Sequence, residues 1–406
     1  MPLNIGLLSF EYPPETGFGG IGTYTWYQAR ALAKLGHIVH VLAGLTTPCP
    51  ELRYLEHDGV RVWRFRSDGG LMSAFKRLDR HRLWWTKNRL ENAVSMHAAL
   101  KALRQRHSLD VLEMPECGAE GLLINYLTRL PSVIKFHSPA SLIMPSYDVR
   151  RADYRLCSVV ERIAMFGATR FMSASQFLAD EVRRKLHVSG DIPVVPNGID
   201  LDLFDQEERI DARKKFNLSP DRPIIFFSGR MERRKGIHLS LDIVPAILER
   251  HDVQIVFAGQ DLFNFVSGSL LPLLQGKRLR GSFTFLGKLD LPDVRACLRQ
   301  ADVFLLPSLW ENCPYSCLEA MAAGRAIVCS DAGGLPELIR HRHNGLLART
   351  GDATAFISAI EELIADPGLR ERLGAEARRT VEQSFTDVQI ARRSVEVYER
   401  CLARPS

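Results

Sequence analysis

The sequence contains no uninterrupted apolar run of about 18 residues, and therefore no candidate for a membrane-spanning helix. Its first residues, MPLNIGLLSFEYPPE, lack the basic start and long apolar stretch of a secretory signal peptide. The eight cysteines include no CxxC pair and no Cys/His spacing of the kind that binds zinc. We therefore expect a cytoplasmic protein with reduced, mostly buried thiols and no metal site.

The composition also lacks the bias that is typical of fibrous or disordered proteins. The 29 glycines and 21 prolines follow no period, which excludes a collagen-like chain. A hydrophobic content of 46% excludes general disorder, and 25% charged residues is typical of a soluble globular protein. A chain of 406 residues at this composition predicts two or three domains.

Positive charge is present, but only in the first half. The formal net charge is +6, and residues 1–196 hold 25 Lys and Arg against 18 Asp and Glu, whereas the remainder holds 28 against 29. Residues 71–90 hold six basic residues and one acidic residue, interleaved with Phe75, Leu83, Trp84 and Trp85. This pattern favours either a patch at a membrane interface or a solvated helix face with a buried Trp pair. Contact with nucleic acid is disfavoured because no nucleic-acid-binding motif accompanies the patch.

Short β-rich apolar runs alternate with segments of helical period along the whole chain, which predicts an α/β fold with parallel sheets. The turn-rich segment PVVPNGIDLDLFDQEE separates two such series, so we place a domain boundary there. The first domain would span 1–196 and be joined by a C-terminal helix in 385–406, and the second would span 197–384. The expected strands are Ile5–Ser9, Ile38–Ala43, Val60–Phe65, Val111–Met114, Val133–His137, Arg170–Ser173, Ile224–Ser228, Gln254–Ala258, Phe283–Leu286, Val303–Leu306 and Ala326–Ser330.

The glycine-rich segment between Gly17 and Gly22 satisfies the G-x-G-x-x-G pattern, but its context argues against a dinucleotide site. Seven residues separate it from the strand that ends at Ser9, whereas the dinucleotide fingerprint needs a tight turn. The acidic residue expected about 20 positions later is also missing. We keep the interpretation of a flexible glycine loop whose N–H groups, Gly20 included, can approach a phosphate or a sugar.

Two cations follow the strand Ile224–Ser228, in the segment that runs from Gly229 to Gly236. Arg230 can engage two phosphate oxygens as a planar fork, and Lys235 can act as a point charge. The start of the following helix adds its dipole. Taken by itself, the segment is equally compatible with a diphosphate site and with a solvated basic turn.

Two glutamates follow the strand Val303–Leu306. Glu311 lies in the loop, and Glu319 lies near the start of the helix that the loop leads to. Both carboxylates can accept hydroxyl groups of a sugar or a ribose. Further N–H groups come from the glycine pair after the next strand. The donor-binding residues we expect here are Asn312, Cys313, Pro314, Tyr315, Ser316, Glu319, Gly333 and Gly334, with Gly229 from the preceding loop.

Four segments resemble the retaining glycosyltransferases of family 4 (glycosyl transferases group 1), and the resemblance extends over nearly the whole chain. The resemblance implies the GT-B fold, with two Rossmann-like domains facing a central cleft and a C-terminal helix that crosses back. It also implies an N-terminal acceptor-binding domain and a C-terminal domain for a nucleotide sugar. The segments are EYPPETGFGGIGTYTWYQARALAKLGHIVHVL, VPNGIDLDLF, SGRMERRKG and LPSLWENCPYSCLEAMAAGRAIVCSDAGGLPELI.

The resemblance also implies roles for single residues. Arg230 and Lys235 would bind the donor diphosphate, Glu319 its ribose, and Glu311 the donor sugar near the reacting carbon. His137, which follows a strand, would lie beside that sugar. Catalysis would then depend on Arg230, Lys235, Glu311 and His137, without a metal ion or a bound cofactor.

The sequence departs from the family pattern at two positions. Cys313 stands where Phe is common, and the Glu113-Met114-Pro115-Glu116 segment replaces a loop that more often contains His. Glu113 and Glu116 either position an acceptor hydroxyl or cap the segment Gly118–Leu127, and Tyr12 is a further acceptor candidate. Asp200 and Asp202 resemble a metal-binding acid pair, but their place after Asn197-Gly198 favours a hinge.

The expected activity is transfer of a hexose from a nucleoside diphosphate to an acceptor hydroxyl, with retention at the anomeric carbon. We expect the acceptor to be a glycan or a polyprenyl-linked sugar of cell-surface polysaccharide synthesis, with peripheral membrane contact through residues 71–90 and no nucleic acid partner. A non-hydrolysing nucleotide-sugar epimerase and a non-catalytic nucleotide-sugar-binding protein remain alternatives, whereas nicotinamide chemistry is disfavoured.

Overall fold

The computed structural model divides the chain into two compact units. Unit 1 comprises Met1–Gly198 with Asp387–Ser406, and unit 2 comprises Ile199–Thr386. The structure describes all residues except 18, 68–69, 145–146, 148, 207–209 and 404–406, and it leaves out the side chains of residues 50, 70–72, 79 and 280. Phe18 of the glycine loop, Glu207 and Glu208 of the expected domain connection, and the last residues of the expected C-terminal helix therefore lie outside the described residues.

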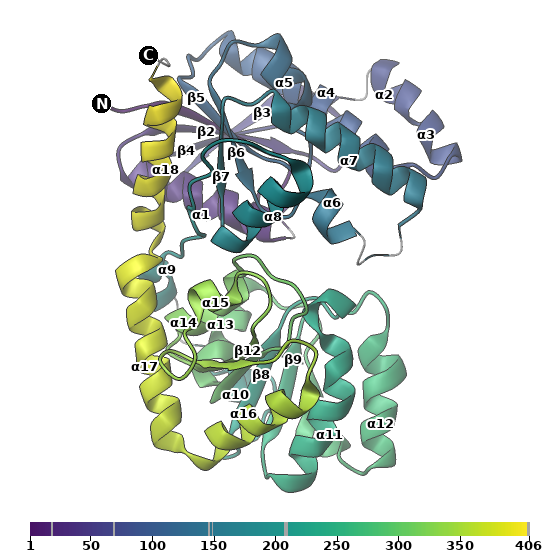
Figure 1. The fold of residues 1–406 in the computed structure, drawn as a ribbon, viewed down its shortest axis with the longest axis vertical. Helices are drawn as coiled ribbons and strands as arrows, with labels where there is room; N and C mark the ends of the chain where they lie inside the picture. Colours follow the sequence, from purple (N-terminus) through teal and green to yellow (C-terminus); the bar gives the residue numbers. More distant parts are fainter. Residues whose placement is uncertain (18, 68–69, 145–146, 148, 207–209, 404–406) are drawn as a thin grey trace. The chain divides into compact units, whose positions relative to one another are not determined.

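Unit 1 contains a seven-stranded sheet with the order β3-β4-β2-β1-β5-β6-β7 (Figure 1). All neighbouring strands are parallel except β3, which pairs antiparallel with β4 at the edge. Strand β3 was not predicted from the sequence. A strand at the edge of a sheet pairs on one side only, and its residues need not form the apolar run by which a buried strand is recognised. The strands are β1 (Asn4–Ser9), β2 (Ile38–Gly44), β3 (Cys49–His57), β4 (Val60–Arg66), β5 (Val111–Pro115), β6 (Ser132–Phe136) and β7 (Arg170–Ser173).

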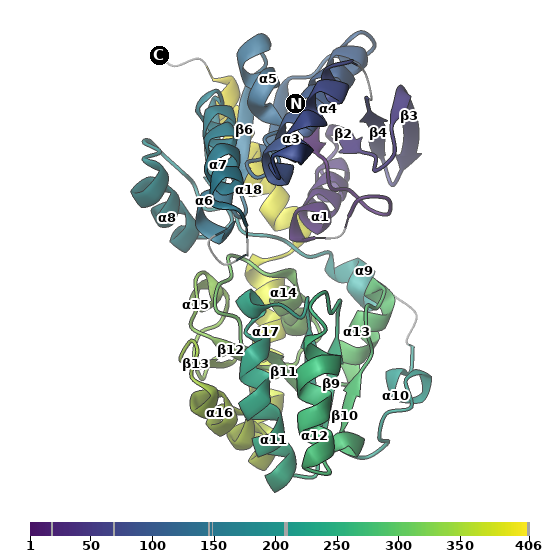
Figure 2. The same cartoon turned by 90° about the vertical axis from the view of Figure 1, so that its right-hand side faces the viewer.

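Helices cover both faces of this sheet (Figures 1 and 2). On one face α1 packs against α18, and on the other α4 packs against α5 and α7. The core between α1, α18 and the strands includes Ile5, Val39, Val111, Ile390 and Tyr398. The helices are α1 (Gly20–Lys34), α2 (Gly70–Phe75), α3 (Arg77–Arg80), α4 (Trp84–Arg104), α5 (Gly121–Leu127), α6 (Ala140–Ile143), α7 (Arg151–Phe166), α8 (Gln176–Leu186) and α18 (Asp387–Leu402).

Unit 2 contains a six-stranded parallel sheet with the order β10-β9-β8-β11-β12-β13. The chain leaves the central strand β8 toward β9 and β10 and then returns to its other side at β11. The order therefore reverses between β8 and β11, where loops at the carboxyl ends of neighbouring strands face a common crevice. The strands are β8 (Ile224–Ser228), β9 (Gln254–Ala258), β10 (Phe283–Phe285), β11 (Val303–Leu306), β12 (Ala326–Ser330) and β13 (Leu346–Ala348).

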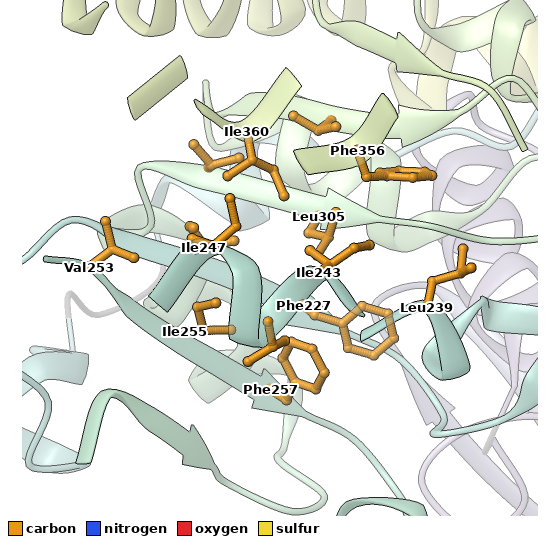
Figure 3. Close-up of a cluster of buried hydrophobic side chains, with 14 of the residues drawn as sticks. Phe227, Leu239, Ile243, Ile247, Val253, Ile255, Phe257, Leu305, Phe356 and Ile360 are labelled. Carbon is orange, nitrogen blue, oxygen red and sulfur yellow. The ribbon is translucent and has the colours of Figure 1, made fainter. Parts of the chain in front are cut away.

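The core of unit 2 lies between its sheet and the helices α11 and α16. Figure 3 shows Phe227 and Phe257 from the sheet beside Ile243 and Ile247 from α11. The alternation of apolar strands and amphipathic helices thus produces the expected α/β class in both units. The helices are α9 (Leu201–Gln206), α10 (Ala212–Lys215), α11 (Ser240–Arg250), α12 (Leu271–Gly276), α13 (Leu291–Gln300), α14 (Tyr315–Ala322), α15 (Leu335–Leu338), α16 (Ala353–Ala365) and α17 (Pro367–Ser384), with short 3-10 turns η2 (Arg233–Lys235), η3 (Ile237–Leu239) and η5 (Arg280–Ser282) and a π turn η4 (Val266–Leu270).

Within the described ranges, no helix is long and apolar enough to cross a membrane. The two aspartates after Asn197 lie at the start of α9, where Asp200 is buried and accepts the N–H of Leu203 at 3.1 Å. A carboxylate in this position caps a helix.

Candidate functional site

The candidate site in unit 2 is built by the loops that follow β8 and β11. These strands are direct neighbours, with Ile225 opposite Val303 and Phe226 opposite Phe304. The register brings the 3-10 turn η2 next to the loop that precedes α14. The N–H of Leu309 donates to the carbonyl of Arg234 at 2.8 Å, so the two loops are also joined through their backbones.

Two glycines allow the close approach of these loops. Gly236 has φ of +72°, and a Cβ atom there would lie 1.8 Å from the carbonyl oxygen of Pro307. Gly333 has φ of +61°, and a Cβ atom there would lie 2.0 Å from the carbonyl oxygen of Glu311. The neighbouring Gly334 donates its N–H to that carbonyl at 3.0 Å. A side chain at either glycine would push the loops apart, because backbone atoms cannot yield.

Glu311 is the centre of a buried charged cluster. Its Oε1 accepts from Lys235 Nζ at 2.5 Å and from the Ser308 hydroxyl at 2.8 Å. Its Oε2 lies 3.6 Å from a guanidinium nitrogen of Arg234. Only 6% of the Glu311 side chain and 13% of the Lys235 side chain are exposed. The predicted catalytic residues Lys235 and Glu311 are therefore in direct contact.

The charge state of this cluster follows from its surroundings. Burial lowers the pKa of Lys235, and the nearby Glu311 carboxylate opposes that effect. Burial alone would raise the pKa of Glu311, but Lys235 and Arg234 outweigh it and hold that pKa below its usual value. Glu311 is therefore a carboxylate at neutral pH, compensated by two cations.

Arg230 lies at the edge of the same cluster and is much more accessible. About half of its side chain is exposed (48%), and one of its nitrogens lies 3.4 Å from Oε1 of the buried Glu232. Glu232 also accepts from Arg234 at 2.8 Å. An accessible guanidinium beside a compensated cluster can bind an anion from solvent, and a phosphate oxygen is the ligand that a planar fork suits best.

The remaining predicted donor-binding residues surround the start of α14. Asn312, Cys313, Pro314, Tyr315 and Glu319 are buried, and Ser316 is half-buried. Tyr315 and Ser316 lie in the first turn of this helix, which Pro314 precedes. The structure thus brings together the predicted residues of unit 2, and their individual roles stay predictions.

Two contributors to this cluster were not singled out from the sequence. Arg234 joins Glu232 to Glu311, and Ser308 donates to Glu311 while its carbonyl accepts the hydroxyl of Ser330 at 2.6 Å. Arg234 lies within a run of basic residues, and the sequence alone does not distinguish a buried cation in this run from a solvated one. Ser308 comes directly after β11, and that position was the available signal.

In unit 1, His137 follows β6 and is held by Glu116. The N–H of His137 donates to both carboxylate oxygens at 3.0 and 2.9 Å, and the N–H of Ser138 donates at 2.5 Å. The His137 ring packs at 4.8 Å against Tyr24 and is 7% exposed. Burial and then the Lys135 cation hold the pKa of His137 well below its usual value, so the ring is neutral at pH 7.

The proposed acceptor residues of unit 1 are all buried. Glu113 is 4% exposed and accepts from the hydroxyls of Tyr24, at 2.7 Å, and of Tyr398 on α18. Glu116 is 1% exposed, and Tyr12 is 6% exposed. Burial raises the pKa of Glu116 to about 8 and that of Tyr12 to about 12. In their described contacts, the two glutamates accept hydrogen bonds from backbone and tyrosine groups. Their role in binding an acceptor stays a prediction.

The glycine loop of unit 1 leads into α1. Gly20 is the first residue of this helix, and a Cβ atom there would meet nothing within 4 Å. The Glu11 side chain accepts the N–H of Gly22 at 3.4 Å. Gly20 therefore borders open space, as a residue near a ligand would, while Glu11 already occupies part of the helix start.

The basic segment 71–90 divides into the short helices α2 and α3 and the first residues of α4. Lys76, Arg77 and Arg80 are exposed. The tryptophan pair splits: Trp84 is 53% exposed, whereas Trp85 packs against a small core of Ala140, Met144 and Cys157. The interpretation of a buried tryptophan pair is therefore not confirmed, because Trp85 is only half-buried and Trp84 is exposed.

Comparison with known families gives two matches that together cover most of the chain. Residues 18–203 match the model described as Glycosyltransferase Family 4. Residues 208–380 match the model described as Glycosyl transferases group 1. The first matched range lies mostly in unit 1 and extends to residue 203 of unit 2, and the second lies in unit 2.

Individual relatives extend over the full length. The chain is 27% identical over 419 residues to alpha-maltose-1-phosphate synthase of Mycolicibacterium smegmatis, covering 99% of this chain and 100% of the relative. Sucrose-phosphate synthase from Thermosynechococcus elongatus has a similar structure, with a TM-score of 0.77, 24% identity and 98% of each chain covered. The catalytic domain of starch synthase IV from Arabidopsis thaliana, solved with ADP and acarbose, gives a TM-score of 0.74 at 18% identity, with full coverage of both chains.

Proposed function

Because the chain belongs to the family-4-type glycosyltransferases and has the GT-B fold, we propose that it transfers a hexose from a nucleoside diphosphate to an acceptor hydroxyl with retention at the anomeric carbon. The observation that best supports a diphosphate donor is the meeting of Arg230, Lys235 and Glu311 at the point where the strand order of unit 2 reverses. Ligands of open α/β sheets bind at such points.

The donor diphosphate is assigned to Arg230 and Lys235. Cleavage of the bond to the sugar leaves negative charge on the diphosphate, and preorganised cations aimed at that charge are typically the largest catalytic contribution. Arg230 is accessible enough to meet an incoming phosphate, whereas Lys235 is already fixed by Glu311. Glu319 is assigned to the ribose and the N–H group of Gly333 to a remaining donor oxygen, because the N–H of Gly334 already donates to the carbonyl of Glu311.

Glu311 is assigned to the hydroxyl groups of the donor sugar rather than to attack on its anomeric carbon. Its Oε1 is engaged by Lys235 and Ser308, whereas Oε2, 3.6 Å from a nitrogen of Arg234, is the oxygen that could accept a sugar hydroxyl. Departure of the diphosphate and attack of the acceptor on the same face accounts for retention without a protein nucleophile. The diphosphate itself would accept the proton of the acceptor hydroxyl, and Arg230 and Lys235 would compensate its charge in place of a metal ion.

The acceptor is proposed to be a glycan or a polyprenyl-linked sugar in cell-surface polysaccharide synthesis. Support comes from the exposed cations Lys76, Arg77 and Arg80 and the exposed Trp84, which suit an acceptor presented at a membrane. Residues 71–90 would then provide peripheral contact.

A donor screen read as release of free nucleoside diphosphate tests the activity. We expect release with one nucleotide sugar that increases when an acceptor is added, and loss of about two orders of magnitude in an Arg230→Ala/Lys235→Ala double variant. Arg233→Ala removes an exposed cation from the same turn and serves as the matched control. Near wild-type release in the double variant would refute the assignment.

The same screen distinguishes the alternatives. A non-hydrolysing nucleotide-sugar epimerase would change the sugar without an acceptor, and a binding protein would retain the nucleotide sugar without turnover. Acceptor-dependent release excludes both.

A further inference from the structure

Helix α7 of unit 1 has its acidic residues on the inner side and four apolar residues on the outer side. Its acidic residues Asp153 and Glu161 are 2% and 1% exposed. Its outer side contains Leu156, Val159, Ile163 and Phe166, which are 45–53% exposed. Surface helices normally direct apolar residues inward and acids outward. Places where a sequence departs from such local rules are frequently functional.

The two inward acids each have a structural role, which explains why they are buried. Asp153 accepts the N–H groups of Trp85 and Thr86, each at 2.8 Å, and thereby caps the start of α4. Glu161 accepts two hydrogen bonds from Arg89 of α4, at 2.9 and 2.8 Å, and the N–H of Ala140 at 2.8 Å. These contacts fix the rotation of α7 and therefore hold its apolar residues in solvent.

The exposed apolar surface continues onto α5, which lies beside α7 (Figure 1). Tyr126 and Leu127 are 55% and 65% exposed. The hydroxyl of Tyr126 donates to the carbonyl of Ile163 at 2.8 Å, so the two helices form one continuous surface. We call the surface of these six residues the α7 face: Tyr126, Leu127, Leu156, Val159, Ile163 and Phe166.

The charge around the α7 face has one sign. The helices α4, α5 and α7 contain three carboxylates, Glu91, Asp153 and Glu161, and all three are buried. Lys101 and Arg104 of α4 line a hollow of about 300 Å³ that Leu127 also lines. The exposed cations of these helices are Lys101, Arg104, Arg151, Arg155 and Arg162.

We propose that the α7 face is a docking surface for an anionic lipid membrane. Exposed Leu, Ile and Phe flanked only by Arg and Lys is the composition of helices that lie in the membrane interface. A second copy of the chain is disfavoured as the occupant, because a two-fold contact packs this surface against itself and brings the positive charges of both copies together. Contiguous exposed apolar residues of this extent mark an interaction site rather than an ordinary surface.

The α7 face adjoins the basic segment proposed above for membrane contact. Asp153 at the start of α7 accepts the N–H of Trp85, and Arg150 donates to the carbonyl of His81, so both segments meet at the same end of the helix. The docking surface therefore consists of the α7 face, and residues 71–90 add positive charge beside it. This inference does not depend on the donor assignment in unit 2.

Sedimentation of the full chain with vesicles tests the proposal. We expect binding to phosphatidylglycerol vesicles that weakens with salt, and little binding to phosphatidylcholine vesicles. Val159→Ser with Ile163→Ser, and separately Arg155→Glu with Arg162→Glu, should each weaken phosphatidylglycerol binding about tenfold or more. Arg183→Glu with Arg184→Glu makes the same charge change on the exposed side of α8 and should leave binding within about twofold.

Three results would overturn the proposal. The first is equal binding by wild type and both α7 variants, or no binding of the wild type to phosphatidylglycerol at low salt. The second is loss of binding on charge reversal at Lys76 and Arg77 while the α7 variants still bind, which assigns docking to residues 71–90. The third is a dimer in lipid-free buffer that Val159→Ser with Ile163→Ser abolishes, which assigns the face to a second copy. Nucleotide release with a soluble acceptor should stay unchanged in the same variants. This measurement keeps the test of membrane docking separate from the test of transferase activity.

Discussion

Lys235 Nζ and Glu311 Oε1 lie 2.5 Å apart, although 76 residues separate them in the sequence. The contact fixes a cation and a carboxylate in one buried position before any ligand arrives. Preorganisation of this kind reduces the cost of reorienting charged groups when negative charge develops in a reaction. It also means that a change to one partner affects the other.

Replacement of Glu311 by Gln should leave the buried Lys235 without its carboxylate. We expect a loss of nucleotide release of about 100-fold or more, because both the sugar contact and the position of Lys235 are disturbed. The measurement is initial rate with the preferred donor and acceptor. Glu249→Gln makes the same chemical change in an exposed surface pair of unit 2 and should leave the rate unaltered. A Glu311→Gln rate close to wild type would rule out the assigned role.

Single replacements of the two donor cations should separate binding from stability. Arg230→Ala removes a half-exposed side chain and should weaken nucleoside diphosphate binding without changing the melting temperature. Lys235→Ala leaves a buried carboxylate partly uncompensated and should destabilise unit 2 by about 3 kcal/mol. Calorimetric titration and thermal melting of both variants provide the measurements. Equal melting temperatures for the two variants would contradict the buried ion pair.

Glu116 is expected to act on catalysis by positioning His137. In Glu116→Gln the amide NH₂ group would face a backbone N–H donor, so the loop that holds His137 must shift. We expect turnover to fall about tenfold while nucleoside diphosphate affinity, which we assign to unit 2, stays constant. Glu116→Asp retains a carboxyl group and should recover part of the turnover. A uniform loss in affinity and turnover would instead indicate general damage to the fold.

Glu120 should make the stability of unit 1 depend on pH. Burial raises its pKa from 4.5 to about 7, and its Oε1 accepts the N–H of Phe10 at 3.3 Å. Because the folded state holds the proton more tightly than the unfolded state, this group favours folding below pH 4.5 and loses that contribution as the pH rises to about 7. The difference amounts to about 3 kcal/mol above that pH.

Melting temperatures across this pH range, compared between wild type and Glu120→Gln, measure the effect. The wild type should lose stability relative to the variant as the pH rises, because Gln does not titrate. Parallel curves for the two proteins would show that Glu120 has an ordinary pKa.

The strand and helix pattern of both units could be read from the sequence because it depends on local periodicity. The strand predicted at Ile224–Ser228 and the strand predicted at Val303–Leu306 match β8 and β11. The antiparallel strand β3 was missed, since an edge strand pairs on one side only and needs no apolar run.

The residue types of the donor site were also visible in the sequence. Arg230, Lys235 and Glu311 each follow a predicted strand, and parallel strands place their carboxyl ends at one edge. The partners that hold these residues were not visible. Arg234 contacts Glu311 only because the register of β8 and β11 aligns two loops that are distant in the chain, whereas Ser308 lies three residues from Glu311 in the same loop.

By itself the sequence determined the α/β class, the two-part organisation and the residue types of the proposed donor site, because strand and helix periods and loop positions are local properties. Only the tertiary structure decided which way the side chains of unit 1 point. Glu116 turns inward to the backbone of His137, and the acids of α7 turn inward to α4, which leaves Leu156 and Ile163 in solvent. A carboxylate can be buried only where other elements supply hydrogen-bond donors. The local sequence around the carboxylate does not show which donors those are.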